Sequence, residues 1–200
     1  MRKKGARNMQ KISSQQILER INGKQVIIVG LRGAGKSYLI EQLAKAENKH
    51  VFIDPLDEHT EHTRFVPSRR MRSEQLQAEV CAFFRKIQGN AKIKLMLCDE
   101  SNQYFINKWQ PLPAEVQDLV DYSRHDKKTI CWVARRITQL PTDITELGDI
   151  YLFFKQTGKN DLRALDDVCS GLKDIMQEQI KSDEHNFIYF DGNKTEVLKI

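Results

Sequence analysis

The stretch Gln25–Ile40, with the sequence QVIIVGLRGAGKSYLI, decides the fold of this chain. It opens with the β-branched, apolar run Val26–Val29, continues with glycines at positions 30, 33 and 35, and ends in further apolar residues. Glycine has no Cβ and adopts positive φ easily. A loop with this spacing can therefore turn its backbone N–H groups toward an anion, which the dipole of a following helix also favours. The stretch predicts a buried strand, a phosphate-binding loop and a helix that continues to about residue 46.

The pattern Gly30-x-x-x-x-Gly35-Lys36-Ser37 is the Walker A motif of P-loop NTPases. A chance match in a chain of this length is on the order of one per cent. Lys36 would supply a positive charge for the β- and γ-phosphates of ATP, and the Ser37 hydroxyl would ligate Mg²⁺. The predicted nucleotide-binding residues are Gly30, Leu31, Arg32, Gly33, Ala34, Gly35, Lys36, Ser37 and Tyr38.

Length and composition favour a single globular domain. The chain has 200 residues, of which 40% are hydrophobic, and this is enough for one full core. Its formal charge is +5 and its pI about 9.0, values that permit an acidic partner such as nucleic acid. We divide the chain into a basic N-terminal arm, residues 1–12, and a single P-loop ATPase domain, residues 13–200. The arm could contact nucleic acid or a partner, or be a solvated tail.

Other sequence features indicate the compartment. The four cysteines have no metal-ligand or redox spacing, so we expect free thiols in a reducing environment. No apolar run is long enough to span a membrane, and the basic N-terminus is not followed by the hydrophobic segment of a secretory signal. We therefore expect a soluble, intracellular protein.

Strands and helices alternate along the chain. Apolar runs predict strands at 50–53, 93–98, 129–134 and 149–154, and helical periodicity predicts helices at 73–87 and 113–126 and two helices within 160–182. A hairpin with a glycine-containing turn is expected over 187–200. This order predicts an α/β fold with a mostly parallel sheet flanked by helices and a C-terminal β-hairpin.

A long polar stretch follows Asp54-Pro55 and reaches Arg72. It is too long for an ordinary connection, so we interpret it as a functional loop. His59 and His62 could bind a metal, but no further ligand completes such a site. Four arginines could face DNA, reach the nucleotide of a neighbouring subunit, or form a solvated surface; they are at positions 64, 69, 70 and 72.

Acids and arginines follow two of the predicted strands. Asp99 ends an apolar strand, as does the Walker B aspartate that helps to hold Mg²⁺. Glu100 follows it and is placed to act as the general base toward water, unless the pair is only an acidic corner. Arg135 and Arg136 end the strand 129–134, at the edge where ligands bind in open α/β sheets. Either could stabilise transition-state charge, in its own subunit or across an interface, or they could be a surface pair.

With these segments in place, the chain resembles the FtsK–HerA superfamily of P-loop ATPases. More narrowly, it resembles the genome-packaging ATPases of tailless, membrane-containing viruses and bacteriophages. The resemblance covers about residues 24–170. It rests on the order of the segments GLRGAGKS, VFIDP, LMLCDES, SRHDKKTICWVARRITQLPTDI and DIYLFF.

The resemblance implies a RecA-like core in which the strand 129–134 lies between the Walker A and Walker B strands. It assigns nucleotide and Mg²⁺ binding to Lys36 and Ser37, metal support to Asp99 and the catalytic base to Glu100. Cellular relatives often have a glutamine sensor where this chain has Arg135, which departs from that pattern; Gln139, a little further on, is the other candidate for the sensor.

The resemblance also implies a function. It indicates an ATP-hydrolysing, Mg²⁺-dependent motor that packages double-stranded DNA into a viral capsid, acting as a homo-oligomeric ring, commonly a hexamer. Capsid or membrane-vertex proteins would be further partners, and the location would be the host cytoplasm or the packaging vertex of the virion. The alternatives are an ATPase for phage morphogenesis or export, similar to zonula occludens toxin, and a nucleotide or small-molecule kinase.

Overall fold

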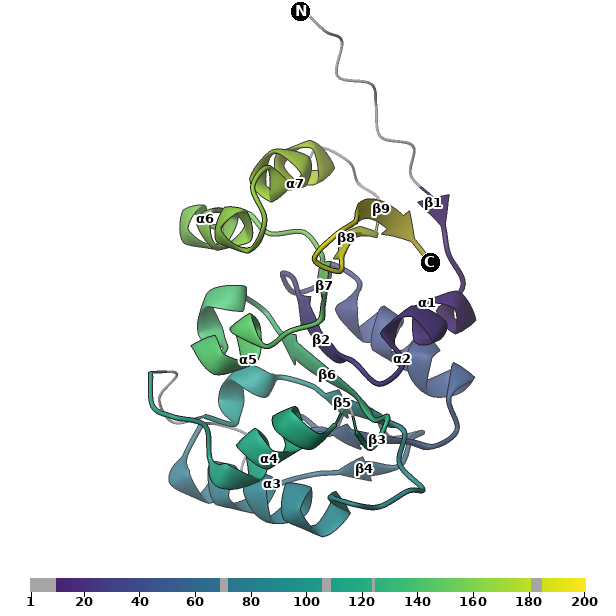
Figure 1. Ribbon diagram of the computed structural model, residues 1–200, viewed down its shortest axis with the longest axis vertical. Helices are drawn as coiled ribbons and strands as arrows, with labels where there is room; N and C mark the ends of the chain where they lie inside the picture. Colours follow the sequence, from purple (N-terminus) through teal and green to yellow (C-terminus); the bar gives the residue numbers. More distant parts are fainter. Residues whose placement is uncertain (1–9, 69–71, 106–108, 124, 181–184) are drawn as a thin grey trace, which may run out of the picture.

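The computed structural model describes residues 10–68, 72–105, 109–123, 125–180 and 185–200. Within them, one nine-stranded sheet runs through the molecule with helices on both faces (Figure 1). The strands are Gln10–Lys11 (β1), Gln25–Val29 (β2), His50–Ile53 (β3), Arg64–Phe65 (β4), Leu95–Cys98 (β5), Thr129–Ala134 (β6), Ile150–Phe153 (β7), Asn186–Phe190 (β8) and Thr195–Lys199 (β9). The helices are Ser14–Ile21 (α1), Lys36–Ala46 (α2), Glu74–Ile87 (α3), Ala114–Tyr122 (α4), Thr142–Glu146 (α5), Lys159–Val168 (α6) and Leu172–Ile180 (α7), with 3-10 turns at Ser101–Gln103 (η1) and Ile137–Gln139 (η2).

The strands are ordered β1-β9-β8-β7-β2-β6-β5-β3-β4, and the central pairs are parallel. β6 lies between β2 and β5, as the resemblance implied. The predicted class is confirmed: a mostly parallel sheet between helices, with β8 and β9 forming the C-terminal antiparallel hairpin. Because β2, β5 and β6 are parallel, the residues that follow them meet at one edge of the sheet.

Alternating side chains of the strands enter two separate cores. Ile27 and Val29 of β2 point to the core formed with α3–α7, whereas Val26 and Ile28 point to the core formed with α1 and α2. All five residues of β2 are buried, as expected for a parallel strand covered on both faces. Helix α2, which follows the glycine-rich loop, therefore packs directly against the strand that precedes that loop.

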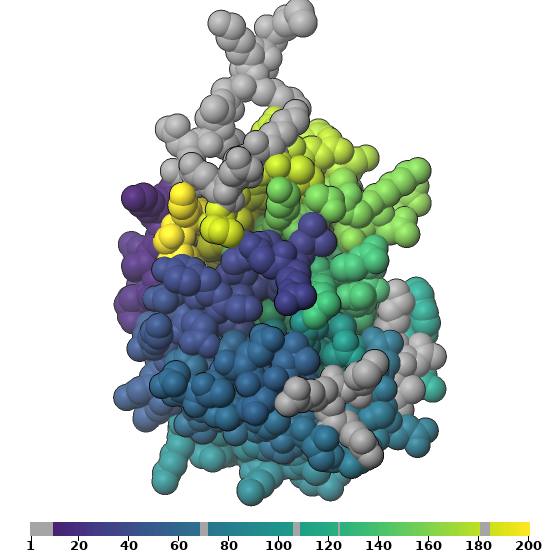
Figure 2. Space-filling view, turned by 180° about the vertical axis from the view of Figure 1, so that it is seen from behind, coloured from purple at the N-terminus to yellow at the C-terminus, as the bar shows by residue number. Residues whose placement is uncertain are grey.

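Two short strands were missed by the sequence analysis. β1 lies within the predicted arm and pairs in parallel with β9, so the first described residues lie beside the C-terminal hairpin, purple against yellow in Figure 2. β4 lies within the predicted functional loop and pairs with β3. A strand of two residues is too short for alternation to be recognised in a sequence. Residues 1–9 of the arm lie outside the described residues.

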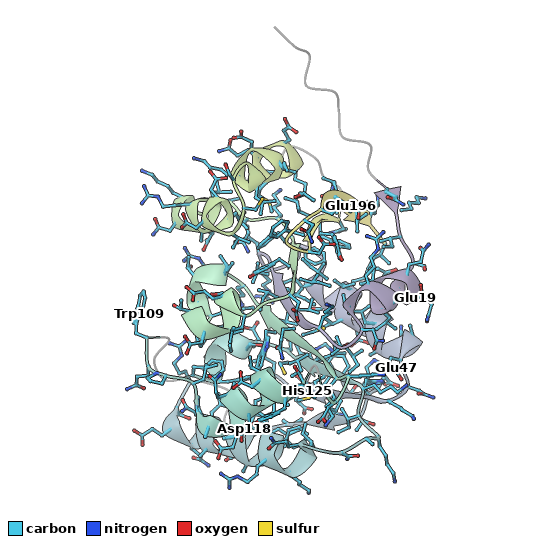
Figure 3. All side chains as sticks on the ribbon, viewed as in Figure 1. Glu19, Glu47, Trp109, Asp118, His125 and Glu196 are labelled. Atoms are coloured by element: carbon cyan, nitrogen blue, oxygen red, sulfur yellow. The ribbon has the colours of Figure 1, made fainter. Side chains whose placement is uncertain are left out.

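Local signals in the sequence explain several boundaries. Ser13 caps α1 with a capping box that includes Gln16. α1 is tied to the hairpin where Arg20 Nη1 donates to Glu196 Oε2 at 2.7 Å; Glu196 is labelled on the hairpin in Figure 3. The predicted break between the last two helices is confirmed, with Gly171 at φ +88° between them. Among the described residues, none of the helices is both long and apolar enough to cross a membrane.

Candidate nucleotide-binding site

The loop between β2 and α2 has the backbone geometry expected of a phosphate-binding loop. Gly33 and Gly35 have φ values of +76° and +107°, which side chains with a Cβ rarely adopt. Gly35 is the residue before α2 and makes no side-chain capping hydrogen bond. The first N–H groups of α2 therefore have no side-chain cap and can meet an anion.

Gly30 has a different role from the one that the sequence suggested. It does not have the positive φ of Gly33 and Gly35. A Cβ at Gly30 would instead lie 2.4 Å from Phe154 Cβ, closer than non-bonded carbon atoms approach. The first glycine of the motif is needed because the end of β2 packs directly against the residue that follows β7.

Lys36 lies at the start of α2 and is held by the loop itself. Its Nζ donates to the carbonyl oxygens of Gly30 at 2.7 Å and Leu31 at 3.2 Å. Burial lowers the pKa of Lys36; the nearby carboxylates of Asp99 and Glu100 oppose this lowering without cancelling it. The loop therefore keeps the ammonium at its mouth and close to the two acids after β5.

The acids after β5 are fixed by a tight turn. The Tyr104 hydroxyl donates to the backbone oxygen of Asp99 and, at 3.1 Å, to that of Ile53, which ties the ends of β5 and β3 together. Glu100 has φ +45° and ψ +39°, a left-handed conformation that costs about 1–2 kcal/mol in a residue other than glycine. Such strain in a non-glycine residue is typical of functional sites.

This turn directs Glu100 toward β6. Its Oε1 accepts hydrogen bonds from Arg135 Nε at 3.1 Å and Nη2 at 3.0 Å, while its Oε2 is buried without a hydrogen-bond partner. A buried carboxylate oxygen without a partner is costly, so this atom is suited to accept a proton or to approach a cation.

The structure separates the two arginines that follow β6. Arg135 reaches Glu100, whereas Arg136 Nε donates to Asp161 Oδ2 at 2.7 Å. Asp161 is 1% exposed and also accepts from Thr138 Oγ1 at 2.8 Å, so Arg136 is held against α6. Arg135 therefore lies beside Glu100 and Arg136 lies against α6, and a catalytic role stays a prediction for both.

Two glutamines follow β6 and β7, the strands on either side of β2. Gln139, the weaker sensor candidate, lies in η2 with its Oε1 buried and without a partner. Gln156 was missed by the sequence analysis. It is fully buried, and its Nε2 donates to the backbone oxygen of Arg135 at 3.0 Å. It follows β7 without any motif around it, so no signal in the sequence marks it.

A histidine network was also missed. His59 Nε2 lies 3.1 Å from Asp99 Oδ2, and His59 Nδ1 lies 2.5 Å from Glu41 Oε1. Burial opposes protonation of His59, but the hydrogen bonds to Asp99 and Glu41 outweigh it and raise its pKa to about 9. The sequence analysis considered His59 and His62 as metal ligands, whereas both bind Glu41. Glu41 lies in the middle of α2, where no pattern distinguishes it from a surface glutamate.

The two side chains predicted to hold Mg²⁺ are both oxygen donors, the Ser37 hydroxyl and the Asp99 carboxylate, and the carboxylate of Glu100 follows Asp99 directly. Hard oxygen ligands are those that Mg²⁺ prefers, and the unpartnered Glu100 Oε2 is an orphaned acceptor at this place. The residues present therefore fit a magnesium ion bound together with nucleotide phosphates. Within the described part of the chain, no cluster of three or more His, Cys, Asp or Glu side chains forms a metal site by itself.

A largely apolar cavity of about 510 Å³ opens beside the first turn of α2. The side chains that line it come from α2, from the end of β7 and from the C-terminal hairpin with its flanking residues; among them are Tyr38, Phe154, His185, Phe187 and Ile200. Tyr38 is 58% exposed, so an aromatic face is available at the mouth of the cavity.

The predicted arginine group is divided. Arg64 Nη2 pairs with Asp57 Oδ1 at 2.9 Å, and Arg72 donates to the backbone oxygen of Asn102. Both make contacts within the chain. Arg69 and Arg70 lie outside the described residues, so the three alternatives for the group stay open.

The parallel sheet, the glycine-rich loop before α2 and the acids after β5 together define a P-loop NTPase fold. No protein-family model and no curated protein matches the chain. Among solved structures, the chain is similar to the genome packaging NTPase B204 from Sulfolobus turreted icosahedral virus 2 in complex with ATP-gammaS, with 19% identity and a TM-score of 0.66 over 88% of this chain and 97% of that one. It is also similar to B204, the DNA-packaging ATPase from Sulfolobus Turreted Icosahedral Virus, with 16% identity and a TM-score of 0.66 over 90% and 98% of the two chains.

These likenesses confirm the predicted resemblance at the level of the fold. The N-terminal domain of zonular occludens toxin from Neisseria meningitidis matches with a TM-score of 0.47 and 14% identity. A likeness that low supports no conclusion about this chain. Function must therefore be argued from the site.

Proposed function

We propose that this chain is a Mg²⁺-dependent ATPase that drives double-stranded DNA into a viral capsid. The observation that carries the proposal is the position of Glu100. It follows directly after Asp99, lies near enough to Lys36 at the phosphate loop to oppose the lowering of that pKa, and keeps one buried carboxylate oxygen without a hydrogen-bond partner. A carboxylate placed in this way can accept a proton from an attacking water, which favours hydrolysis over transfer to a kinase substrate.

In this proposal, the loop 30–37 binds the phosphates through backbone N–H groups, and Lys36 exchanges its bonds to loop carbonyls for bonds to phosphate oxygens. Ser37 and Asp99 would hold Mg²⁺, which neutralises charge on the β- and γ-phosphates when bound. Glu100 takes the proton of the water. Arg135, whose side chain is half exposed, bonds Glu100 and would turn toward the γ-phosphate of a bound nucleotide.

The cavity beside α2 is the proposed place of the adenine base. It adjoins Lys36 and Ser37, and its lining is largely aromatic and aliphatic, as the flat face of a base requires. Exposed Tyr38 at its mouth can stack on the base. Replacing Tyr38 should therefore weaken binding of ATP and of AMP alike, because AMP retains the base.

The motor function is proposed from two further features. The packaging NTPases of similar fold are covered over nearly their whole length, and the net charge of +5 suits a polyanion. We propose a ring of identical subunits, commonly a hexamer, in which Arg136 or the arginines after Asp54 could act on a neighbour's nucleotide. Capsid or membrane-vertex proteins would be the further partners, in the host cytoplasm or at a vertex of the virion.

The test is steady-state ATP hydrolysis with and without long double-stranded DNA, at low and at moderate salt. We expect stimulation by DNA that fades as salt rises, because phosphate contacts release counterions. Lys36→Ala should abolish both basal and stimulated turnover while the chain stays folded. Turnover that DNA leaves unchanged would favour an export ATPase over a motor that DNA alone stimulates, and transfer of phosphate to an acceptor would favour a kinase.

A further inference from the structure

His59 is held rigidly although it lies in a connection. Its side chain is 2% exposed, and its ring stacks on Phe52 with centroids 4.1 Å apart and planes inclined by 20°. Its backbone N–H donates to Asp54 Oδ2 at 2.8 Å. The backbone and one face of the ring are thus both fixed, so the direction of the two ring nitrogens is set by the fold.

The two ring nitrogens of His59 face carboxylates on different elements. Nε2 lies 3.1 Å from Asp99 Oδ2 after β5, and Nδ1 lies 2.5 Å from Glu41 Oε1 on α2. Because carboxylates accept hydrogen bonds, each nitrogen donates. The ring therefore connects Asp99 to α2, the helix that begins with Lys36 and Ser37.

Glu41 is itself held in place. Its other oxygen, Oε2, lies 2.6 Å from His62 Nε2, and His62 Nδ1 lies 3.0 Å from His50 Nε2. His50 in turn contacts the backbone oxygen of Glu47 at 2.6 Å. A line of hydrogen bonds thus runs from Asp99 through His59, Glu41 and His62 to the far end of α2.

Packing alone does not explain this arrangement. A core histidine needs one or two neutral partners, whereas His59 uses both nitrogens on carboxylates, and one of these is the residue expected to support the metal. Asp99 Oδ1 accepts the N–H of Glu100 at 2.9 Å, so His59 determines the position of the remaining oxygen. Partners that orient metal ligands in this way are worth about 10–100-fold in metal affinity or activity.

We propose that His59 is a positioning residue of the magnesium site. By donating to Asp99 and to Glu41 together, it sets the orientation of the Asp99 carboxylate relative to Ser37 at the start of α2. The inference rests on the proposed function, in which Ser37 and Asp99 hold Mg²⁺ with the nucleotide. It adds a residue from a third segment of the chain, outside both motifs.

The experiment compares Mn²⁺ binding, measured by electron paramagnetic resonance on the complex with ADP, in the wild type and in variants. His59→Ala should weaken Mn²⁺ binding by about 10–100-fold, with little change in ADP affinity without metal. His59→Gln should recover part of the loss, because its amide can still donate to Asp99. His62→Ala is the matched control, since it removes a histidine of the same line that does not touch Asp99.

A purely structural role gives a different pattern. The loss of Mn²⁺ affinity in each variant would then be proportional to its loss of thermal stability. A positioning role predicts instead that the loss of Mn²⁺ affinity is largest in His59→Ala, smaller in Glu41→Gln and smallest in His62→Ala. If His59→Ala does not fold, the comparison of His59→Gln with His62→Ala decides, and positioning predicts the larger loss of Mn²⁺ affinity in His59→Gln. Equal Mn²⁺ affinity in the His59 variants and in His62→Ala would overturn the inference, while the proposed function would stand. If Mn²⁺ does not tighten the binding of ADP to the wild-type protein, both the proposed function and the inference are overturned.

Discussion

Two loops approach the acids at the end of β5, and they are organised in opposite ways. The loop 30–35 is organised by its backbone: Gly33 and Gly35 supply unusual φ values, and loop carbonyls hold Lys36. The connection 54–63 is organised by side chains, with His59 stacked on Phe52 and bonded to two carboxylates. The first is a contiguous segment of sequence, whereas the second takes partners from three elements.

The difference shows what each loop can contribute to the site. A backbone loop offers N–H groups whose direction does not depend on side-chain rotamers, which suits an anion. A side-chain network offers fixed charge and fixed orientation, which suits a metal ligand. Asp99 and Glu100 lie between these two kinds of support, so each prediction below changes one side of the comparison.

The largest effect should come from Glu100→Gln, because Glu100 lies between the loop 30–35 and the connection 54–63. The amide cannot accept a proton from water, so turnover should fall by about 10²–10⁴-fold, while nucleotide binding by the loop 30–37 stays close to that of the wild type. Single-turnover hydrolysis and fluorescent-nucleotide binding measure the two separately. Glu115→Gln on α4 is the matched control. Turnover that survives in Glu100→Gln would mean that Glu100 is not the base.

The next effect concerns Arg135, which contacts Glu100 from β6. Arg135→Gln should lower turnover by about 10²-fold, because one charged donor to the reacting phosphate is lost. It should leave the free energy of unfolding nearly unchanged, because the Arg135 side chain is half exposed.

Arg136→Gln provides the contrast on the same strand end. This substitution removes the guanidinium that bonds the buried Asp161 carboxylate, so we expect a loss of about 1–3 kcal/mol in the free energy of unfolding and little change in turnover. Urea denaturation and steady-state rates separate the two variants. The reverse pattern would move the active arginine to Arg136, in its own or a neighbouring subunit.

A third prediction distinguishes the glycines of the backbone loop. Gly30→Ala places a Cβ against Phe154, so the end of β2 or of β7 must shift, at a cost of about 1–3 kcal/mol in the free energy of unfolding. Gly33→Ala meets no atom within 4 Å and should cost only the strain of a positive φ, about 1 kcal/mol. Equal losses in urea denaturation would mean that Gly30 is not needed for packing.

The sequence could predict the backbone loop and much of the fold. Strong apolar runs marked β2, β3, β5, β6 and β7, and the motif at Gly30–Ser37 placed the phosphate loop between a strand and a helix. The acids at Asp99 and Glu100 were predicted because they end such a run. The two-residue strands β1 and β4 were missed, since a pattern needs more residues than they contain.

The side-chain network could not be predicted. His59 and His62 were noticed for their spacing, but their partner Glu41 lies 18 residues before His59 on a helix face that carries no signal. Nothing in the sequence favoured Arg135 over Arg136 as the catalytic arginine. Their roles differ in the structure because the turn at Glu100 brings that carboxylate to Arg135, whereas the buried Asp161 binds Arg136. Contacts between side chains of distant elements depend on how α2 packs on the sheet, and this packing is a property of the whole fold.

The smallest effect should come from Phe52→Leu, which loosens the second loop without touching an acid. Phe52 is fully buried, and its ring stacks on His59 and lies 5.1 Å from that of His62. Leucine stays apolar but is smaller and loses the stacking, so we expect a loss of about 1 kcal/mol in the free energy of unfolding. Phe84→Leu, in the other core, is the matched control. Hydrogen exchange should then accelerate across residues 54–63 in Phe52→Leu alone, because this loop is stacked on the Phe52 ring through His59. Equal exchange in both variants would mean that the stacking does not hold the loop.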